Sequence, residues 1–252
     1  MNFIKVRDVV IGEGRPKICV PVVGKTVSEI VEQAKSFEGV PYDMVEWRLD
    51  HFEGACDWNR IEEVLPVIRE IVGNAPLLVT FRTAEEGGEC SIGVQDYAEL
   101  LAKVAASGDA DLLDMELNML EQMPEMVAAV HLAGGVIVGS CHDFEKTPSK
   151  DEIIANLCRM QDLGCDIVKM ATMPNCKRDV ITLLAATEEM CTDHAKVPVV
   201  SMSMTGLGVV SRLVGESFGS AITFGCFGKA SAPGQMDAPT LDGVLEAIHK
   251  AL

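Results

Sequence analysis

The chain has 252 residues, of which 48% are hydrophobic and 23% charged, so a sizeable core is expected and intrinsic disorder is not. Its formal net charge is −17 at pH 7, and no Lys/Arg stripe is present to neutralise phosphates, which argues against nucleic acid and anionic membranes as partners. A small anionic substrate remains compatible with this charge if arginines cluster locally.

The cysteines and the apolar segments indicate the compartment. Nine cysteines are scattered without Cys-x-x-Cys pairs, which is typical of a reduced, intracellular protein that uses cysteine as a small hydrophobe. The N-terminal residues lack the apolar segment of a secretory signal, and no apolar stretch approaches the ~18 residues of a membrane span. We therefore expect a cytoplasmic protein.

Short β-branched runs alternate with helix-period segments along the chain. Residues 6–16 predict a short β-hairpin with a turn at Gly12 to Gly14. The predicted strands that follow cover residues 18–23, 45–49, 77–81, 112–117, 136–140, 167–171, 199–203 and 222–226. The clearest amphipathic helices cover residues 27–34, 61–72, 151–157 and 241–252. Helix-ending glycines precede several strands, at Gly73, Gly108, Gly134, Gly164 and Gly219.

This alternation predicts parallel strands joined by helical crossovers. Eight such units in a chain of this length fit one closed α/β barrel, a (β/α)₈ TIM barrel that spans residues 1–252 as a single domain. The hairpin would close the bottom of that barrel. The alternative is an open doubly wound sheet, but the first strand runs into Gly24-Lys25-Thr26-Val27 without the Gly-rich phosphate loop common in that fold.

Polar residues gather where the predicted strands end, which is where barrel enzymes place their chemistry. Seven of the eight strands have them. The groups are Glu46, Arg48 and Asp50 on one strand face; Arg82, Thr83 and Glu86; Asp114 and Glu116; His142 and Asp143; Lys169; Ser203 with Arg212 just after; and Ser231 to Gln235.

Lys169 lies in Asp166-Ile167-Val168-Lys169-Met170-Ala171, a run typical of a fully buried strand. A buried lysine with a lowered pKa is a free amine that can form a Schiff base with a ketone or aldehyde. The alternative is a lysine whose head reaches the strand end and pairs with a carboxylate. The strand alone leaves both interpretations open.

The surrounding groups give the first interpretation a chemical logic. A Schiff base acidifies the neighbouring carbon, His142 can remove that proton and pass it to a leaving group, and Glu86 can orient the histidine. An arginine can grip a carboxylate in bidentate fashion. The substrate class is then a small hydroxylated keto acid. The alternative for an isolated Glu/Arg pair is a solvated ion pair without a role in binding. No metal is expected, because no second His or Cys stands at ligand spacing from His142.

The motifs resemble the type I 3-dehydroquinate dehydratases over nearly the whole chain. The matching stretches are Glu46-Trp47-Arg48-Leu49-Asp50, Thr80-Phe81-Arg82-Thr83, Glu86-Gly87-Gly88-Glu89, His142-Asp143-Phe144, Lys169-Met170-Ala171, Met202-Ser203-Met204, Ser211-Arg212 and Lys229 to Gln235.

The resemblance implies a (β/α)₈ barrel that converts 3-dehydroquinate to 3-dehydroshikimate and water in the shikimate pathway. It implies Lys169 as Schiff-base lysine and His142 as general acid/base, with Glu86 supporting His142. It also implies a syn elimination, no metal or cofactor, and a homodimer. The substrate contacts it implies are Glu46, Arg48, Arg82, Arg212, Ser231 and Gln235, with Arg212 on the carboxylate.

The sequence departs from some relatives at two places. Pro21 stands at the first strand end, where a serine hydroxyl is found in some members, so this strand is expected to contribute shape only. The stretch Thr205-Gly206-Leu207-Gly208 replaces a Ser-Lys-Thr-Gly. Residues 230–235 have the small residues, Pro and Gly of a lid that could close over the mouth.

Two rival functions remain at this point. A Schiff-base aldolase would share the lysine on the sixth strand, but it would not need a histidine base at the fifth strand or the stretch that ends at Gln235. A non-catalytic binding barrel would be favoured by a lost catalytic residue, and every matched catalytic position is present.

Overall fold

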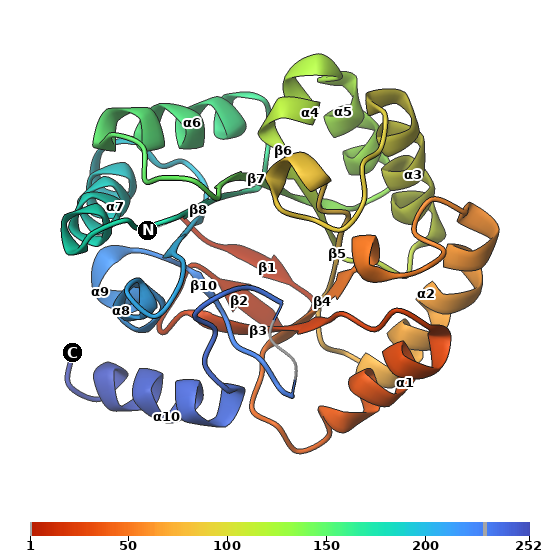
Figure 1. Cartoon of the computed structure of the whole chain (residues 1–252), viewed down its shortest axis with the longest axis horizontal. Coiled ribbons are helices and arrows are strands. Elements are labelled where there is room, and N and C mark those ends of the chain that lie inside the picture. The colour runs from red at the N-terminus through yellow and green to blue at the C-terminus, as the bar shows by residue number, and fades with distance from the viewer. Residues whose placement is uncertain (1, 229–230) are drawn as a thin grey trace.

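The computed structural model describes residues 2–228 and 231–252, and within them eight parallel strands form one sheet. Each strand from β3 to β8 pairs with the next along the chain, and β10 returns to pair with β3 (Figure 1). The predicted α/β barrel is therefore confirmed. The strands are β3 (Lys17–Val22), β4 (Met44–Arg48), β5 (Leu77–Thr80), β6 (Leu112–Glu116), β7 (Val136–Asp143), β8 (Ile167–Thr172), β9 (Val199–Ser203) and β10 (Ile222–Phe224).

The ring closes between β9 and β10 through sparser backbone pairing than elsewhere. The backbone N–H of Ala221 donates to the carbonyl of Val199 at 2.8 Å, beside an isolated parallel bridge between Val199 and Ser220. The Ser220 hydroxyl supplements this seam by accepting from the backbone N–H of Ser201 at 3.0 Å.

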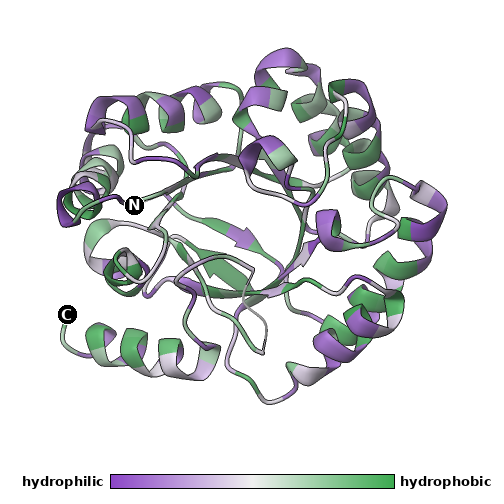
Figure 2. Cartoon of the chain, viewed as in Figure 1, coloured by the Kyte–Doolittle hydropathy of each residue, from purple (hydrophilic) through white to green (hydrophobic). Residues whose placement is uncertain are grey.

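The helices surround the strand ring (Figure 1). They are α1 (Val27–Ser36), α2 (Trp58–Val72), α3 (Val94–Ser107), α4 (Leu117–Gln122), α5 (Glu125–Leu132), α6 (Lys150–Asp162), α7 (Lys177–Glu189), α8 (Val209–Leu213), α9 (Gly215–Phe218) and α10 (Ala238–His249). Figure 2 shows hydrophilic and hydrophobic residues alternating along these helices, as a cover for a barrel requires. Side-chain caps fix several starts: Thr26 accepts from the N–H of Glu29, and Ser149 and Glu152 form a capping box.

Side chains along each strand point alternately outward, toward the helices, and inward, into the barrel, and so form two apolar layers. In β8, Val168 and Met170 point outward and join the core between sheet and helices, whereas Ile167 and Ala171 belong to the cluster inside the barrel. Lys169 shares the inward face with these two residues. The same alternation places the charged residues at the strand ends inside the barrel mouth.

An N-terminal hairpin of β1 (Ile4–Val6) and β2 (Val9–Ile11) fills the interior at the other end, as predicted. Its turn was predicted wrongly. Val6 pairs directly with Val9, so Arg7 and Asp8 form the turn, with Arg7 at φ 52°. Gly12 lies after the hairpin at φ 104°, where a Cβ would stand 2.4 Å from the carbonyl oxygen of Asn2. The glycines therefore serve the exit from the hairpin.

Two strand ends differ from the prediction in ways that affect the site. β7 continues through His142 and Asp143, because these residues keep a parallel register with Ala171 and Thr172 of β8. β4 stops at Arg48, and Asp50 lies in a 3₁₀ turn (Leu49–His51) instead of on the strand face. Across the part of the chain that the structure describes, no helix has both the length and the apolarity needed to cross a bilayer.

The hairpin generates a prediction about stability. Ile11 is 0% exposed inside the barrel, so Ile11→Ala should lower the free energy of unfolding by about 2–4 kcal/mol through the cavity it leaves. The matched variant Ile4→Ala, at a half-buried position of the partner strand, should lose clearly less. Urea unfolding of both variants makes the comparison, and equal losses would contradict the role of Ile11 as the plug.

Candidate active site

A cavity of about 170 Å³ opens at the carboxyl ends of the strands. All nine side chains predicted as site residues line it, although they come from widely separated segments of the chain. They are Glu46, Arg48, Arg82, Glu86, His142, Lys169, Arg212, Ser231 and Gln235. Apolar walls complete the cavity, contributed by Phe144, Ala171, Met202, Met204 and Phe224 among others.

Lys169 lies deep in this cavity and is only 5% exposed. Its Nζ is 3.2 Å from Oδ2 of Asp114 and 4.9 Å from the ring centroid of Phe224. The head therefore points into the barrel and does not reach the surface. Asp114 offsets the ammonium charge, which burial would otherwise make costly. The ammonium must pass on a proton before the nitrogen can act as a nucleophile.

Arg82 stands at the centre of a buried charge cluster. Its guanidinium is 2.7 Å from Asp114 and 2.8 Å from Glu116, and it also donates to Ser140 at 3.0 Å. Burial alone raises the pKa of Asp114, but Arg82 and then Lys169 outweigh it, so the pKa is lowered. Arg82 lines the cavity, yet most of its donors are already committed to these partners.

His142 and Glu86 form a paired unit on one side of the cavity. Oε2 of Glu86 accepts from the backbone N–H of His142 at 3.0 Å and lies 2.8 Å from Nδ1 of the ring. An oxygen that already accepts one hydrogen bond accepts a second from Nδ1–H, so the network assigns the proton to Nδ1 and leaves the lone pair on Nε2. The sequence-based expectation that these two side chains meet is therefore met.

Burial favours the uncharged form of both partners. It lowers the pKa of His142 well below its usual value, and the nearby cations Arg82, Lys169 and Arg48 lower it further. Burial also raises the pKa of Glu86, opposed by Arg82 and aided by Glu116 and Asp114. A neutral imidazole with a free Nε2 can act as a general base at neutral pH.

Arg212, at the end of α8, is the contrasting arginine. It is 2% exposed, yet it has no carboxylate in ion-pair range among the residues that the structure describes. Its Nη2 donates to the carbonyl of Pro233 at 3.3 Å, its Nη1 contacts the sulfur of Met202 at 3.6 Å, and its Nε is buried without a partner. Burial lowers the pKa of Arg212 to about 10. A buried, uncompensated cation beside a cavity is suited to bind an anion.

The remaining predicted contacts are bonded to one another or to neighbouring side chains. Ser231 and Gln235 bond each other, with the backbone N–H of Ser231 donating to Oε1 at 2.8 Å and Nε2 donating to the hydroxyl at 2.9 Å. Glu46 accepts from the hydroxyl of Thr80 at 2.8 Å, and Arg48 pairs with Asp50 at 2.8 Å. The start of the predicted lid, Ala230, and the motif residue Lys229 lie outside the described residues.

Comparisons with known proteins show the family of the chain. The family model described as "Type I 3-dehydroquinase" matches residues 18–251. The chain belongs to the type I 3-dehydroquinase family. It is 47% identical over 251 residues to a protein of Listeria monocytogenes serotype 4b (strain F2365) named 3-dehydroquinate dehydratase, covering 99% of both chains.

Solved structures of family members have the same fold. A type I 3-dehydroquinate dehydratase from Clostridium difficile superposes with a TM-score of 0.97 at 44% identity, covering 100% of both chains. A 3-dehydroquinate dehydratase from Geobacillus kaustophilus HTA426 superposes with a TM-score of 0.96 at 34% identity, covering 99% of this chain and 97% of that one.

Two features of this cavity were not assigned from the sequence. Asp114 was noted at a strand end but not as the partner of Lys169; its one signal was the period of two that it shares with Glu116. Phe144 lines the cavity beside Gly87, where a Cβ would stand 2.4 Å from its ring. Pro21 is absent from the cavity lining among the described residues, in keeping with the expected shape-only role of its strand.

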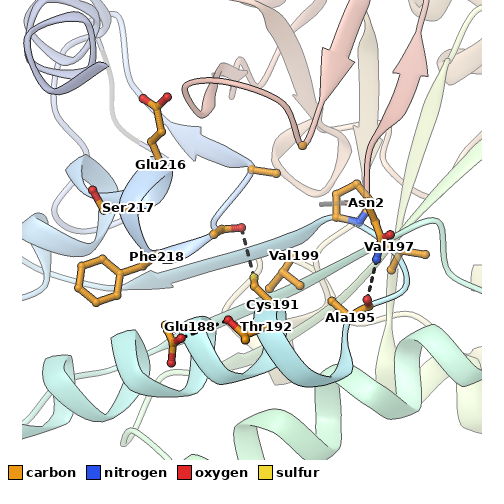
Figure 3. A pocket seen from close by; sticks show the side chains of 14 residues that line it. Asn2, Glu188, Cys191, Thr192, Ala195, Val197, Val199, Glu216, Ser217 and Phe218 are labelled. Carbon is orange, nitrogen blue, oxygen red and sulfur yellow. Dashed lines mark hydrogen bonds between the residues drawn. The ribbon is translucent and has the colours of Figure 1, made fainter. Parts of the chain in front are cut away.

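A second hollow, of about 230 Å³, lies near the start of β9 and beside the hairpin (Figure 3). Asn2 is fixed there by the carbonyl of Ala195 at 2.6 Å, and Cys191 donates to the carbonyl of Gly219 at 3.4 Å. Burial raises the pKa of Cys191 to about 11, so the thiol stays protonated. The described residues that line it include no lysine, arginine or histidine, and no group of three or more potential metal ligands occurs among the described residues.

Two of the three buried arginines of the site, Arg82 and Arg212, should respond oppositely to removal of their charge. Arg82→Met leaves Glu116 without its buried arginine and Asp114 with Lys169 as its remaining cation, so it should lower the free energy of unfolding by about 3–5 kcal/mol. Arg212→Met removes a buried charge that lacks a carboxylate, so it should leave the free energy of unfolding unchanged or raise it. Denaturant unfolding without ligand measures both, and a large loss in Arg212→Met would contradict its uncompensated state.

Proposed function

We propose that this chain is a 3-dehydroquinate dehydratase that removes water from 3-dehydroquinate through a Schiff base on Lys169. The observation that carries the proposal is the meeting, in one cavity, of a buried lysine, a neutral histidine and an uncompensated arginine. The family match supports the reaction class. The Clostridium difficile relative was solved with "covalent modified comenic acid", which supports covalent chemistry at this kind of site.

The first half of the proposed reaction builds the imine. After Lys169 gives up a proton, its nitrogen adds to the ketone carbon, and the ketone oxygen leaves as water to give the iminium. The iminium withdraws electrons from the bond between the neighbouring carbon and its hydrogen. Nε2 of His142 takes that proton, and the electron pair moves into an enamine.

The second half expels the hydroxyl. The enamine pushes out the hydroxyl at the next carbon, and the imidazolium of His142 protonates it as it departs, so water leaves and the imidazole is neutral again. A second water then hydrolyses the iminium, which releases 3-dehydroshikimate and returns Lys169. The proton removed and the proton delivered pass through one histidine, which is consistent with a syn elimination.

The other predicted side chains hold the substrate in this proposal. Arg212 binds the carboxylate, because it is the buried cation that lacks an anionic partner. Ser231 and Gln235 lie beside it and exchange their mutual hydrogen bonds for bonds to the substrate. Glu46, Arg48 and Arg82 also line the cavity and contact the hydroxyl groups in this proposal.

A role in the shikimate pathway follows from this reaction. A homodimer and a cytoplasmic location remain predictions of the family resemblance, and sedimentation of the purified protein measures the first.

The reaction and its covalent intermediate can be tested together. Purified protein with 3-dehydroquinate should produce the absorbance of a conjugated enone, in the presence of EDTA, and borohydride added during turnover should trap an adduct on Lys169. Lys169→Met, which keeps an unbranched side chain without the amine, is the control and should give neither signal. Turnover with no adduct at Lys169 in peptide mass spectrometry would remove the Schiff base; no turnover at all would remove the proposed function.

The lowered pKa of His142 predicts the acid limb of the pH profile. The base is active when neutral, so kcat/KM is retained as pH falls to about 6.5, the usual histidine value, and is lost only below it, when the imidazole gains a proton. Steady-state rates across acidic pH measure the limb. A limb above the usual histidine value would contradict the buried, cation-surrounded environment of His142.

A further inference from the structure

Asp50 is a buried carboxylate that has no part in the reaction as proposed. Its residue is 1% exposed, and its side chain does not line the cavity. It lies in the 3₁₀ turn directly after β4, which brings the carboxylate back toward Arg48, two residues earlier.

The first contact of Asp50 is a two-point ion pair. Oδ1 accepts from Nε of Arg48 and Oδ2 from Nη2, each at 2.8 Å. A two-point bond at these two nitrogens fixes the plane of the guanidinium and does not use Nη1, and Arg48 lines the cavity. Burial raises the pKa of Asp50, but the hydrogen bond and charge of Arg48 outweigh it, so the pKa is lowered and the carboxylate stays ionised.

The second contact is with the segment that carries Glu86. Oδ1 of Asp50 also accepts from the backbone N–H of Arg82 at 3.3 Å, and Oδ2 accepts from that of Glu89 at 3.2 Å. Cys90 donates its thiol to the Asp50 carbonyl at 3.3 Å. These bonds secure both ends of the segment 82–90.

The segment 82–90 is closed by its own backbone hydrogen bonds. Bonds that fix its two ends therefore also fix the position of Glu86 within it. The N–H of Ala84 donates to the carbonyl of Cys90 at 2.9 Å, and that of Gly88 donates to the carbonyl of Thr83 at 2.8 Å. Gly88 lies so close to the preceding strand end that a Cβ there would stand 1.9 Å from the carbonyl oxygen of Arg82. Glu86 lies within this closed loop, with His142 bonded to it.

We propose that Asp50 is a positioning residue that couples the substrate-binding guanidinium of Arg48 to the loop that sets Glu86 and hence His142. One carboxylate thereby aligns a binding group and the support of the catalytic base. This inference rests on the proposed function for its consequences, since it assigns effects on KM and kcat of that reaction.

The competing interpretation is that Asp50 only stabilises the fold, and the chain offers a matched control for it. Asp111, just before β6, also joins two arginines and a backbone N–H: its carboxylate is 2.6 Å from Arg7, 2.7 Å from Arg69 and 2.8 Å from the N–H of Leu77. It lies at the opposite end of the barrel, next to the hairpin turn. Loss of its charge tests what a structural carboxylate contributes.

The experiment compares Asp50→Asn with Asp111→Asn in the dehydration assay, with thermal unfolding of each. Asp50→Asn removes the charge and replaces one acceptor oxygen by an NH₂ group, so in either orientation of the amide one bond to Arg48 and one bond to the loop are lost. We expect KM to rise about tenfold and kcat to fall at least about threefold in Asp50→Asn, whereas Asp111→Asn loses stability and keeps both constants within about twofold. Equal kinetic behaviour of the two variants would overturn the inference.

Double variants show the route of the coupling. In an Arg48→Met background, Asp50→Asn should change KM by less than about twofold, and in a Glu86→Gln background it should change kcat by less than about twofold. The full single-variant effect in both backgrounds would overturn the coupling. If Asp50→Asn alone does not fold, the double variant Arg48→Met/Asp50→Asn removes both buried charges and replaces it. A kcat below that of Arg48→Met then supports the contact of Asp50 with the loop, and an unchanged kcat contradicts it.

Failure of the inference is distinct from failure of the proposed function. A native chain that does not dehydrate 3-dehydroquinate contradicts the function. A native chain with turnover, beside an Asp50→Asn variant that behaves like Asp111→Asn, contradicts the positioning role alone.

Discussion

The ion pairs of Arg82 with Asp114 and Glu116 are the contacts on which the rest of the site depends. Arg82 lowers the pKa of Asp114 against the opposing effect of burial, and this carboxylate contacts Lys169. The same guanidinium contributes to the low pKa of His142. Arg82 therefore acts on both the carboxylate that contacts the lysine and, in addition to burial, the pKa of the histidine, so the lysine and the histidine share one charge network.

Much of the fold could be predicted because its signals are local. Strand and helix periods, and the glycines that end helices, located every barrel strand. The pairing of strands was harder to predict where it depends on contacts between residues distant in sequence. The hairpin turn was misplaced because glycine is a strong turn signal, whereas Arg7 reaches a positive φ only with the support of the paired strands and of Asp111. The end of β7 depends on its register with β8, which no local pattern reveals.

The site residues could be found from the sequence because strand ends and family motifs mark them, and the resemblance implied their roles, but the contacts that hold each side chain could not be predicted. The strand pattern alone does not show which partners Arg48, Arg82 and Arg212 have. The structure distinguishes them by their partners: Asp50 for the first, a carboxylate cluster for the second, and no carboxylate among the described residues for the third. Such differences arise from positions that only the closed barrel brings together.

The seam between β9 and β10 has a consequence for motion. Backbone pairing is sparsest there, and serine side chains bear part of the connection, so opening fluctuations of the ring are expected to begin at this seam. The helix that carries Arg212 directly follows β9, and the hydroxyl of Thr223 in β10 bonds the carbonyl of Arg212 at 2.9 Å. Arg212, proposed above to bind the substrate carboxylate, thus contacts both of the strands whose pairing is sparsest. A carboxylate bound to Arg212 would therefore stabilise the closed ring at the seam between β9 and β10, where its strand pairing is sparsest.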